Sequence, residues 1–254
     1  MTDVAILAVL QGVAEFLPIS SSGHLVIAQH LLGVEEPGLR LDIALHFGTL
    51  LSVFAFYRRA IWRIVRDLDW RYALKIVASA LPAVAAYFCF KGFIDGLFEN
   101  VRMVGALLMF TGAVLIGTRY MPRGSADVGF ARAVLMGLGQ AIALLPGISR
   151  SGMTIACARA GRVDPDRSAE FSFLMAAPLI IGGTLLEIVK SATATSASAE
   201  ASSSWWTLAA GAAIAAAVGY VSLAVLIKAV RGKWFWLFGP YCLAAGLVTI
   251  LLVR

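Results

Sequence analysis

The stretch QGVAEFLPISSSGHL, residues 11–25, places a carboxylate, a proline, three consecutive serines and a histidine inside an otherwise apolar region. The surrounding chain predicts a membrane protein, because 60% of its 254 residues are hydrophobic and only 14% are charged. Irregular polar backbone is tolerated at membrane depth only where it is buried in protein or lines a water-filled cavity. This stretch is therefore expected to face the interior of a helical bundle.

The polar cluster divides residues 3–33 into two apolar segments, each too short to cross a bilayer, and residues 130–160 repeat this pattern. Both regions predict re-entrant helical hairpins. Longer apolar runs predict six full spans, at 41–58, 72–90, 102–119, 169–190, 206–230 and 235–252. The predicted fold class is an all-α polytopic membrane protein with six transmembrane helices and two re-entrant hairpins, in a single domain over residues 1–254.

The two hairpin regions align with each other at an offset of 129 residues. This alignment matches Gln11 with Gln140, Ser20 with Ser149, Ser21 with Arg150, Ser22 with Ser151 and Gly23 with Gly152. Each hairpin is followed by three spans, which gives one repeat over about 3–119 and another over about 130–252. Because three is odd, the second repeat enters from the opposite side, and the special segments of an inverted repeat meet near the midplane.

Most lysines and arginines fall in loops on one side of this topology, including the Arg-rich loop 58–71, and that side is predicted to be cytoplasmic. The first hairpin and the C-terminus then lie on the outer side, and the second hairpin enters from the cytoplasm. The same loops explain the net charge of +6 without a nucleic-acid partner. Residues 1–3 lack the basic region of a cleaved signal peptide, so we expect this segment to be retained.

Arg150 lies in LLPGISRSGMTIA, residues 144–156, after a Pro-Gly break and between Ser149 and Ser151. The break predicts that a short helix starts here. A helix start presents free N–H groups and a partial positive charge, and a guanidinium offers a planar fork that suits phosphate. The second hairpin is therefore predicted to bind an anion.

Glu15 and Arg150 both lie within apolar segments, where a charge costs at least ~2.5–3.5 kcal/mol and usually serves a function. The two hairpins can supply these charges to each other. Glu15 would bind a divalent cation or accept a proton, Ser21 or His24 would attack phosphorus, and Arg150 would stabilise the transferring phosphoryl group. Asp42 is expected to orient the hairpins or to bind an arginine, and His46 is expected to be a satisfied polar group inside the bundle. Neither is expected to act as a catalyst.

The two motifs resemble the signatures of the BacA-type undecaprenyl-pyrophosphate phosphatases, (E/Q)-x-x-x-E-F-L-P-x-S-S-[TS]-G-H and P-G-x-S-R-S-G. The resemblance extends through DIALHFGTLLSVFAFYRR at 42–59 and AEFSFLMAAPLIIGG at 169–183. It implies a multi-pass enzyme of the bacterial cytoplasmic membrane that recycles the cell-wall lipid carrier. Such an enzyme hydrolyses undecaprenyl pyrophosphate to the monophosphate and inorganic phosphate at the outer face, aided by Mg²⁺ or Ca²⁺.

Position by position, the resemblance implies a set of catalytic residues, namely Glu15, Ser21, His24 and Arg150, with Glu15 also binding the metal. It implies a substrate-binding set as well, namely Gln11, Ser20, Ser22, Ser149, Ser151 and Gly152. The family's first acidic position holds Gln11 here. The lost negative charge either weakens metal affinity or shifts coordination onto Glu15, the substrate phosphates and water.

Several alternatives stay open from sequence. Ser21 is the preferred nucleophile, His24 is its close competitor, and direct attack by water also fits. An inverted repeat with opposed hairpins is also found in transporters, so the rival function is translocation of a polyprenyl phosphate with or without hydrolysis. Gln11 motivates a third hypothesis, an inactive lipid-binding homologue. The expected partners are the polyprenyl pyrophosphate and membrane lipids, and association into a homodimer stays open.

Overall fold

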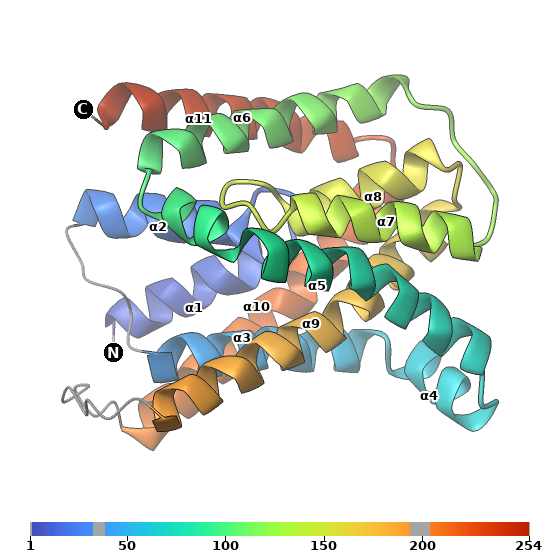
Figure 1. The fold of residues 1–254 in the computed structure, drawn as a ribbon, viewed down its shortest axis with the longest axis horizontal. Coiled ribbons are helices and arrows are strands. Elements are labelled where there is room, and N and C mark those ends of the chain that lie inside the picture. The colour runs from blue at the N-terminus through green and yellow to red at the C-terminus, as the bar shows by residue number, and fades with distance from the viewer. Residues whose placement is uncertain (1, 33–38, 194–203, 254) are drawn as a thin grey trace.

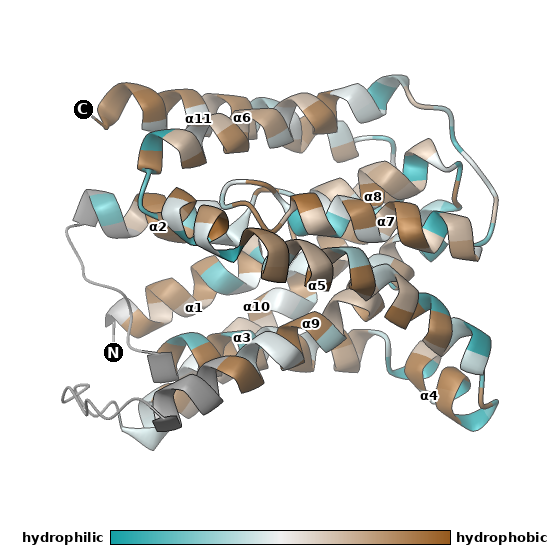
Figure 2. Cartoon of the chain, in the orientation of Figure 1, coloured by the Kyte–Doolittle hydropathy of each residue, from teal (hydrophilic) through white to brown (hydrophobic). Residues whose placement is uncertain are grey.

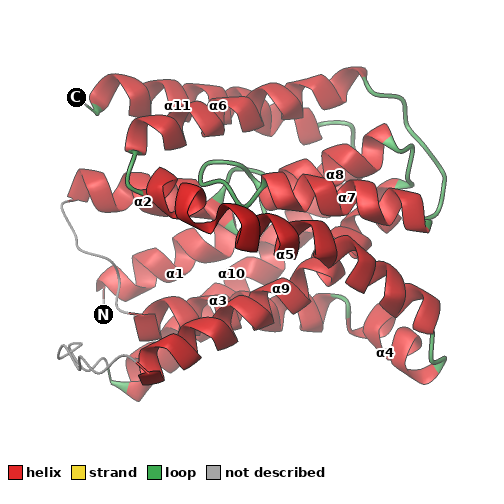
Figure 3. Cartoon of the chain, viewed as in Figure 1, coloured by secondary structure: helices red, strands yellow, loops and turns green. Residues whose placement is uncertain are grey.

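The structure is a computed structural model that describes residues 2–32, 39–193 and 204–253 (Figure 1). These ranges contain eleven α-helices, joined by loops and two short 3₁₀ segments (Figure 3). The helices are α1 Thr2–Ala14, α2 Ser21–Leu32, α3 Leu39–Phe56, α4 Arg58–Arg66, α5 Trp70–Phe98, α6 Val101–Gly117, α7 Phe130–Ile142, α8 Arg150–Ala160, α9 Pro165–Thr193, α10 Trp205–Arg231 and α11 Phe238–Leu252. The all-α prediction is confirmed for this part of the chain, where the β-structure is limited to an isolated bridge between Ala126 and Val163.

Five helices among the described residues are long and apolar enough to cross a membrane. They are Trp70–Phe98, Val101–Tyr120, Pro165–Leu186, Trp205–Arg231 and Phe235–Leu252. These helices correspond to five of the six predicted spans, whereas the predicted span at 41–58 forms a shorter apolar helix, Leu41–Phe56. The long helices consist mainly of hydrophobic residues, and hydrophilic residues gather at helix ends (Figure 2). This distribution is expected when lipid is the surrounding solvent. The protein is therefore of the multi-pass membrane class.

The two predicted hairpin regions form two pairs of short helices, α1–α2 and α7–α8. These helices have 11 to 13 residues each. At 1.5 Å per residue they are about 16–20 Å long, which is too short for a ~30 Å hydrocarbon core. The helical breaks fall where Pro18 and the Pro-Gly step at 146–147 predict them.

The second helix of each pair starts with the same serine cap. The Ser149 hydroxyl accepts a hydrogen bond from the Gly152 amide at 3.1 Å. The Ser20 hydroxyl accepts one from the Gly23 amide at 3.2 Å. Such bonds satisfy amides that have no partner in the first turn of a helix. The 129-residue sequence match therefore corresponds to a match in local structure.

The long helices hold these pairs from both sides: α10 packs against α1 and α3, α5 packs against α7, and α6 packs against α11. The α6–α11 contact is close because glycines face each other across it. A Cβ added at Gly105 would lie 2.9 Å from the Gly246 carbonyl oxygen, and one at Gly112 would lie 2.7 Å from that of Gly239. Small residues at such positions let helix backbones approach within a membrane.

The Arg-rich segment 58–71 differs from its prediction as a loop, because most of it folds into α4 and the start of α5. In α4, Ala60 is buried while its arginines and Trp62 are exposed. The segment alternates apolar and basic residues at helical spacing, so one face can pack while the guanidiniums stay in water. Helix α4 lies at one end of the bundle (Figure 1).

Candidate active site

The two helical breaks contact each other in the centre of the bundle. A Cβ added at Gly23 would lie 2.9 Å from Gly147 Cα, and one added at Gly152 would lie 3.4 Å from Pro18 Cβ. Residues 18 and 147, like residues 23 and 152, are matched by the 129-residue offset. The contact is therefore reciprocal, as it is across a two-fold axis.

Helices α6 and α11 support the two breaks in a corresponding way. The Thr111 hydroxyl donates to the Gly147 carbonyl at 3.0 Å and accepts from the Ser149 amide at 3.1 Å. On the other side, the Cys242 thiol donates to the Pro18 carbonyl at 3.6 Å. Each break is thus held by a helix from the opposite half of the chain, which fixes the positions of the side chains at the tips.

Gly147→Ala is expected to destabilise the protein. Gly147 has φ of +95°, and an added Cβ would lie 2.4 Å from the Val104 carbonyl oxygen. A strained backbone of this kind costs about 1–3 kcal/mol before any steric clash is added. The melting temperature of the purified protein should fall by about 2–12 °C, at about 2–4 °C per kcal/mol for a chain of this size. Gly92→Ala is the matched control, because a Cβ at Gly92 meets nothing within 4 Å; equal melting temperatures for both variants would contradict the close contact.

Glu15 and Arg150 form an ion pair where the tips meet. Arg150 Nη2 donates to Glu15 Oε1 at 2.8 Å, and the side chains are 18% and 8% exposed, respectively. The other carboxylate oxygen, Oε2, accepts from the Ser21 hydroxyl at 2.8 Å and from the Gln11 amide at 3.3 Å. Arg150 Nη1 is buried without a hydrogen-bond partner. The pair thus connects the two hairpins and leaves Nη1 of the guanidinium without a protein partner.

Two adjoining cavities flank this ion pair. The smaller one has a volume of about 470 Å³ and is lined by Ala14, Glu15, Ser20, Ser21, Ser22, Ala143, Ile148, Ser149 and Arg150. The larger one has a volume of about 670 Å³ and shares Glu15, Ala143 and Arg150 with it. A diphosphate needs hydrogen-bond donors in an enclosed site, and here hydroxyls, a guanidinium and helix starts surround one space.

The remaining predicted site residues lie close to the cavities without lining them. Ser151 and Gly152 are buried behind Ser149, and the Ser151 hydroxyl lies 3.3 Å from that of Ser149. Gln11 is 1% exposed, and its side-chain amide donates a hydrogen bond to the Glu15 carboxylate. These residues therefore support the groups that line the smaller cavity.

His24 lines neither of the two catalytic cavities. Its Nδ1 lies 2.8 Å from the Ser20 carbonyl oxygen, and its Nε2 lies 2.8 Å from the Tyr241 hydroxyl. The two rings also stack, with centroids 5.7 Å apart. Both ring nitrogens are thus engaged. Sequence reasoning did not identify Tyr241, because it lies in an ordinary apolar helix with no motif around it.

The larger cavity contains polar residues that sequence reasoning left outside the site. Gln140 is 2% exposed, and neither of its amide atoms has a hydrogen-bond partner. Asp42 and His46 line the same cavity and lie 3.5 Å apart. The match between Gln11 and Gln140 in the repeat was the one sequence signal for Gln140. A buried amide without partners favours a role in ligand contact.

The fold and the site define a helical, multi-pass membrane protein with an acid, hydroxyls and a guanidinium brought together by two helical hairpins. The chain belongs to the family described as bacitracin resistance protein BacA, whose pattern matches residues 4–248. It is 42% identical over 252 residues to an undecaprenyl-diphosphatase of Rhodopirellula baltica, covering 98% of this chain and 96% of that protein. It is 39% identical over 268 residues to an undecaprenyl-diphosphatase of Desulfosudis oleivorans, covering 96% of this chain and 96% of that protein. It is 36% identical over 270 residues to one of Desulforapulum autotrophicum, covering 97% of this chain and 96% of that protein. The predicted family is confirmed.

Proposed function

We propose that the protein is an integral membrane hydrolase that converts undecaprenyl pyrophosphate to undecaprenyl phosphate and inorganic phosphate. Its membership of a family with relatives named undecaprenyl-diphosphatase supports this function. The observation that carries it is the Glu15–Arg150 pair, 135 positions apart in sequence, beside the Ser21 hydroxyl. The names of the relatives support hydrolysis rather than transport of a polyprenyl phosphate.

Release of phosphate from undecaprenyl pyrophosphate by the purified protein in detergent tests this function. Translocation alone requires no hydrolysis and would give no free phosphate. A folded preparation that binds the lipid but releases no phosphate would exclude the proposed activity.

In the first chemical step, Ser21 Oγ attacks the terminal phosphorus of the diphosphate. The bond from that phosphorus to the bridging oxygen breaks, and undecaprenyl phosphate leaves with the electron pair. The Ser21 proton passes to Glu15 Oε2, which accepts its hydrogen bond at 2.8 Å. A phosphoserine intermediate results, and splitting one difficult step into two is the advantage of nucleophilic catalysis.

Arg150 stabilises the charge on the transferring phosphoryl group. Its Nη2 is held by Glu15, while its buried Nη1 has no protein partner and faces the developing charge. The Phe173 ring lies under the guanidinium, 5.9 Å from it, and limits its motion. The proton that Glu15 gained in the first step leaves with the undecaprenyl phosphate. In the second step, water attacks phosphorus, the bond from phosphorus to Ser21 Oγ breaks, and the proton that the Glu15 carboxylate accepts from the water passes to Ser21 Oγ. Phosphate and free Ser21 are restored.

We prefer Ser21 over His24 as the nucleophile because Ser21 lines the smaller cavity and His24 does not. Ser21 also donates to Glu15, whereas the two nitrogens of His24 are engaged by the Ser20 carbonyl and the Tyr241 hydroxyl. A nucleophile has to reach the reacting atom before its pKa matters. His24 is therefore assigned to positioning the Ser20 turn.

The residues around Glu15 fit a divalent cation of the Mg²⁺ or Ca²⁺ type. The described residues contain no cluster of three or more His, Cys, Asp or Glu that could hold a metal by themselves. Glu15 and the buried, unpartnered Oε1 of Gln11 offer two oxygens, and Mg²⁺ commonly adds substrate phosphates and water to one or two protein ligands. Such a cation would neutralise phosphate charge when bound.

Gln11→Glu is expected to strengthen the response to the metal, because it adds a carboxylate within reach of Glu15. The metal concentration for half-maximal phosphate release should fall, and chelator should inhibit both proteins. Asn100→Asp is the matched control, because it adds a carboxylate at the exposed N-terminal cap of α6, outside both catalytic cavities. Phosphate release that is indifferent to chelator in both proteins would remove the cation from the proposal.

We assign the finer topology as six spans, with α3 as the first, and two half-depth hairpins in an inverted repeat. The matched serine caps and the reciprocal contacts of the tips support the repeat. Basic residues are frequent in α4, in the α6–α7 loop and at the end of α10, and α4 lies at one end of the bundle (Figure 1). Their number supports a cytoplasmic location for that end. The catalytic cavities then open toward the outer face of the cytoplasmic membrane.

A further inference from the structure

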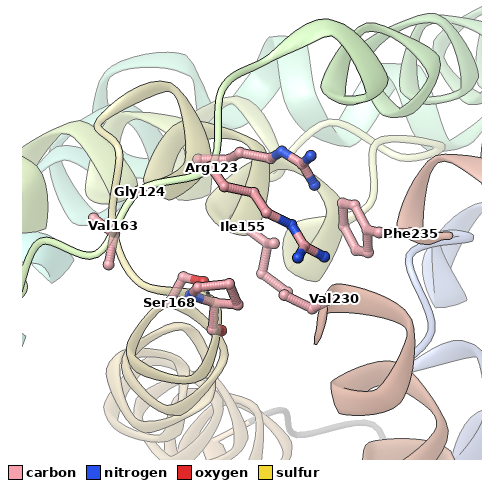
Figure 4. Close-up of a pocket in the computed structure, with 9 residues that line it drawn as sticks. Arg123, Gly124, Ile155, Val163, Ser168, Val230 and Phe235 are labelled. Carbon is pink, nitrogen blue, oxygen red and sulfur yellow. Dashed lines mark hydrogen bonds between the residues drawn. The ribbon is translucent and has the colours of Figure 1, made fainter. Parts of the chain in front are cut away.

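A third cavity lies away from the catalytic cavities, where α8 and α10 end and α9 begins. It has a volume of about 320 Å³ and shares no lining residue with the cavities at Glu15 and Arg150. Its lining combines two arginines, a serine and apolar side chains: Arg123, Gly124, Ile155, Arg159, Val163, Pro165, Ser168, Val230 and Phe235 (Figure 4). Arg159 follows Arg150 by nine positions in α8, which places their Cα atoms about 14 Å apart along the helix.

The two arginines bring positive charge to this cavity without a carboxylate to balance it. Within the described ranges, Arg123 donates to the Arg231 carbonyl and Arg159 to the Met121 carbonyl at 3.5 Å, and neither forms an ion pair. Arg159 Nε is buried without a partner. A buried, unsatisfied donor on a charged group is costly, so the site is incomplete as the protein alone forms it.

The nearest acidic residues are already engaged. Asp166 pairs with the side chain of Arg231. Asp164 caps α9 by accepting from the amides of Asp166 and Arg167 at 3.0 and 3.2 Å. These two carboxylates therefore do not supply the negative charge that would balance Arg123 and Arg159.

Aromatic and basic residues beside the cavity indicate that it lies at the level of the lipid headgroups. Phe235 lines it, and the adjacent Trp236 has the Arg119 guanidinium 4.6 Å above its ring. Tryptophan beside arginine at the ends of membrane helices marks the interface between hydrocarbon and water. The cavity is surrounded by the ends of α8 and α10 and the start of α9, which also indicates a position at this interface.

We propose that the Arg123–Arg159 cavity is a second anion site, which binds the phosphate group of an anionic phospholipid or inorganic phosphate. Two guanidinium forks can donate to several phosphate oxygens at once, and the apolar wall of Ile155, Val230 and Phe235 excludes water from these bonds. The Ser168 hydroxyl adds a further polar group to the lining. This inference does not depend on the proposed hydrolysis.

The experiment measures the melting temperature of purified protein in an uncharged detergent. A Glu15→Gln, Arg150→Gln background removes the guanidinium that would bind an anion in the catalytic cavities, and the variants of Arg123 and Arg159 are compared within this background. Inorganic phosphate is titrated in one arm, phosphatidylglycerol in mixed micelles in a second, and phosphatidylcholine in a third. Stabilisation by inorganic phosphate identifies free phosphate as a ligand, and stabilisation by phosphatidylglycerol alone identifies a lipid headgroup.

Arg123→Gln combined with Arg159→Gln should raise the half-saturating anion concentration by about tenfold or more. Arg59→Gln, an exposed arginine outside the cavity, is the control for charge loss. If the double variant does not fold, the two single variants are judged by the same criterion. The proposal is overturned if neither anion stabilises the background protein, or if the cavity variants and Arg59→Gln respond alike.

Discussion

Arg150→Ala is expected to lower phosphate release from undecaprenyl pyrophosphate by about 10³-fold or more, the effect of removing an arginine that stabilises a transferring phosphoryl group. The loss should appear mainly in kcat, because the buried Nη1 acts on charge that develops in the transition state. Arg150→Lys should recover little, since an ammonium cannot hold Glu15 and a phosphate oxygen in one plane. Arg167→Ala, outside both catalytic cavities, is the matched control.

Loss of folding has to be separated from loss of catalysis in this experiment. Glu15 is only 8% exposed, so removing Arg150 leaves a buried charge unpaired, at a cost of about 3–5 kcal/mol. The double variant Glu15→Gln, Arg150→Met removes both charges and should recover most of that stability. It should remain inactive, because neither the proton acceptor nor the guanidinium is present. Phosphate release by Arg150→Ala equal to that of the unmodified protein would remove Arg150 from the mechanism.

The sequence was sufficient to predict the two helical breaks and the pairing of Glu15 with Arg150, because the breaks follow from residues close to each other in the chain and the pairing follows from the chemistry of buried charge. Pro18 and the step at 146–147 predict breaks in apolar segments, and the serines that follow are typical helix caps. A charge within an apolar segment requires a partner of opposite charge, and Glu15 Oε1 lies 2.8 Å from Arg150 Nη2 in the structure. Hydrophobicity likewise predicted five of the long helices within a few residues of most ends.

Other parts of the site depend on packing between distant segments, which a single sequence does not encode locally. Tyr241 engages His24 because α11 packs against α6 and reaches the first break, a relation that no motif near Tyr241 reveals. Gln140 looks like an ordinary polar residue in an apolar helix until its burial without partners is seen. Helix α4 was missed for a different reason, since its density of arginine was interpreted as solvated loop rather than as one face of an amphipathic helix.

Ser21→Ala is expected to lower phosphate release by a factor similar to that of Arg150→Ala, because it removes the proposed nucleophile. Ser22→Ala is the matched control: Ser22 lines the same cavity, but its hydroxyl lies 3.4 Å from that of Ser20 and makes no bond to Glu15. It should retain activity within about tenfold, the range of one lost neutral hydrogen bond. His24→Asn should give an intermediate loss by loosening the Ser20 turn.

A trapping experiment identifies the group that attacks phosphorus. Substrate labelled in the terminal phosphate is mixed with enzyme and quenched within one turnover, and the label is then followed on the protein. Label that survives acid and maps to Ser21 is the expected result, because a phosphoserine is acid-stable whereas a phosphohistidine is acid-labile. Acid-labile label in the unmodified protein and in Ser21→Ala would assign the attack to His24 instead. Full activity of Ser21→Ala with no label on either residue would assign it to water, and Glu15, which already holds the Ser21 hydroxyl at 2.8 Å, would then hold the attacking water in its place.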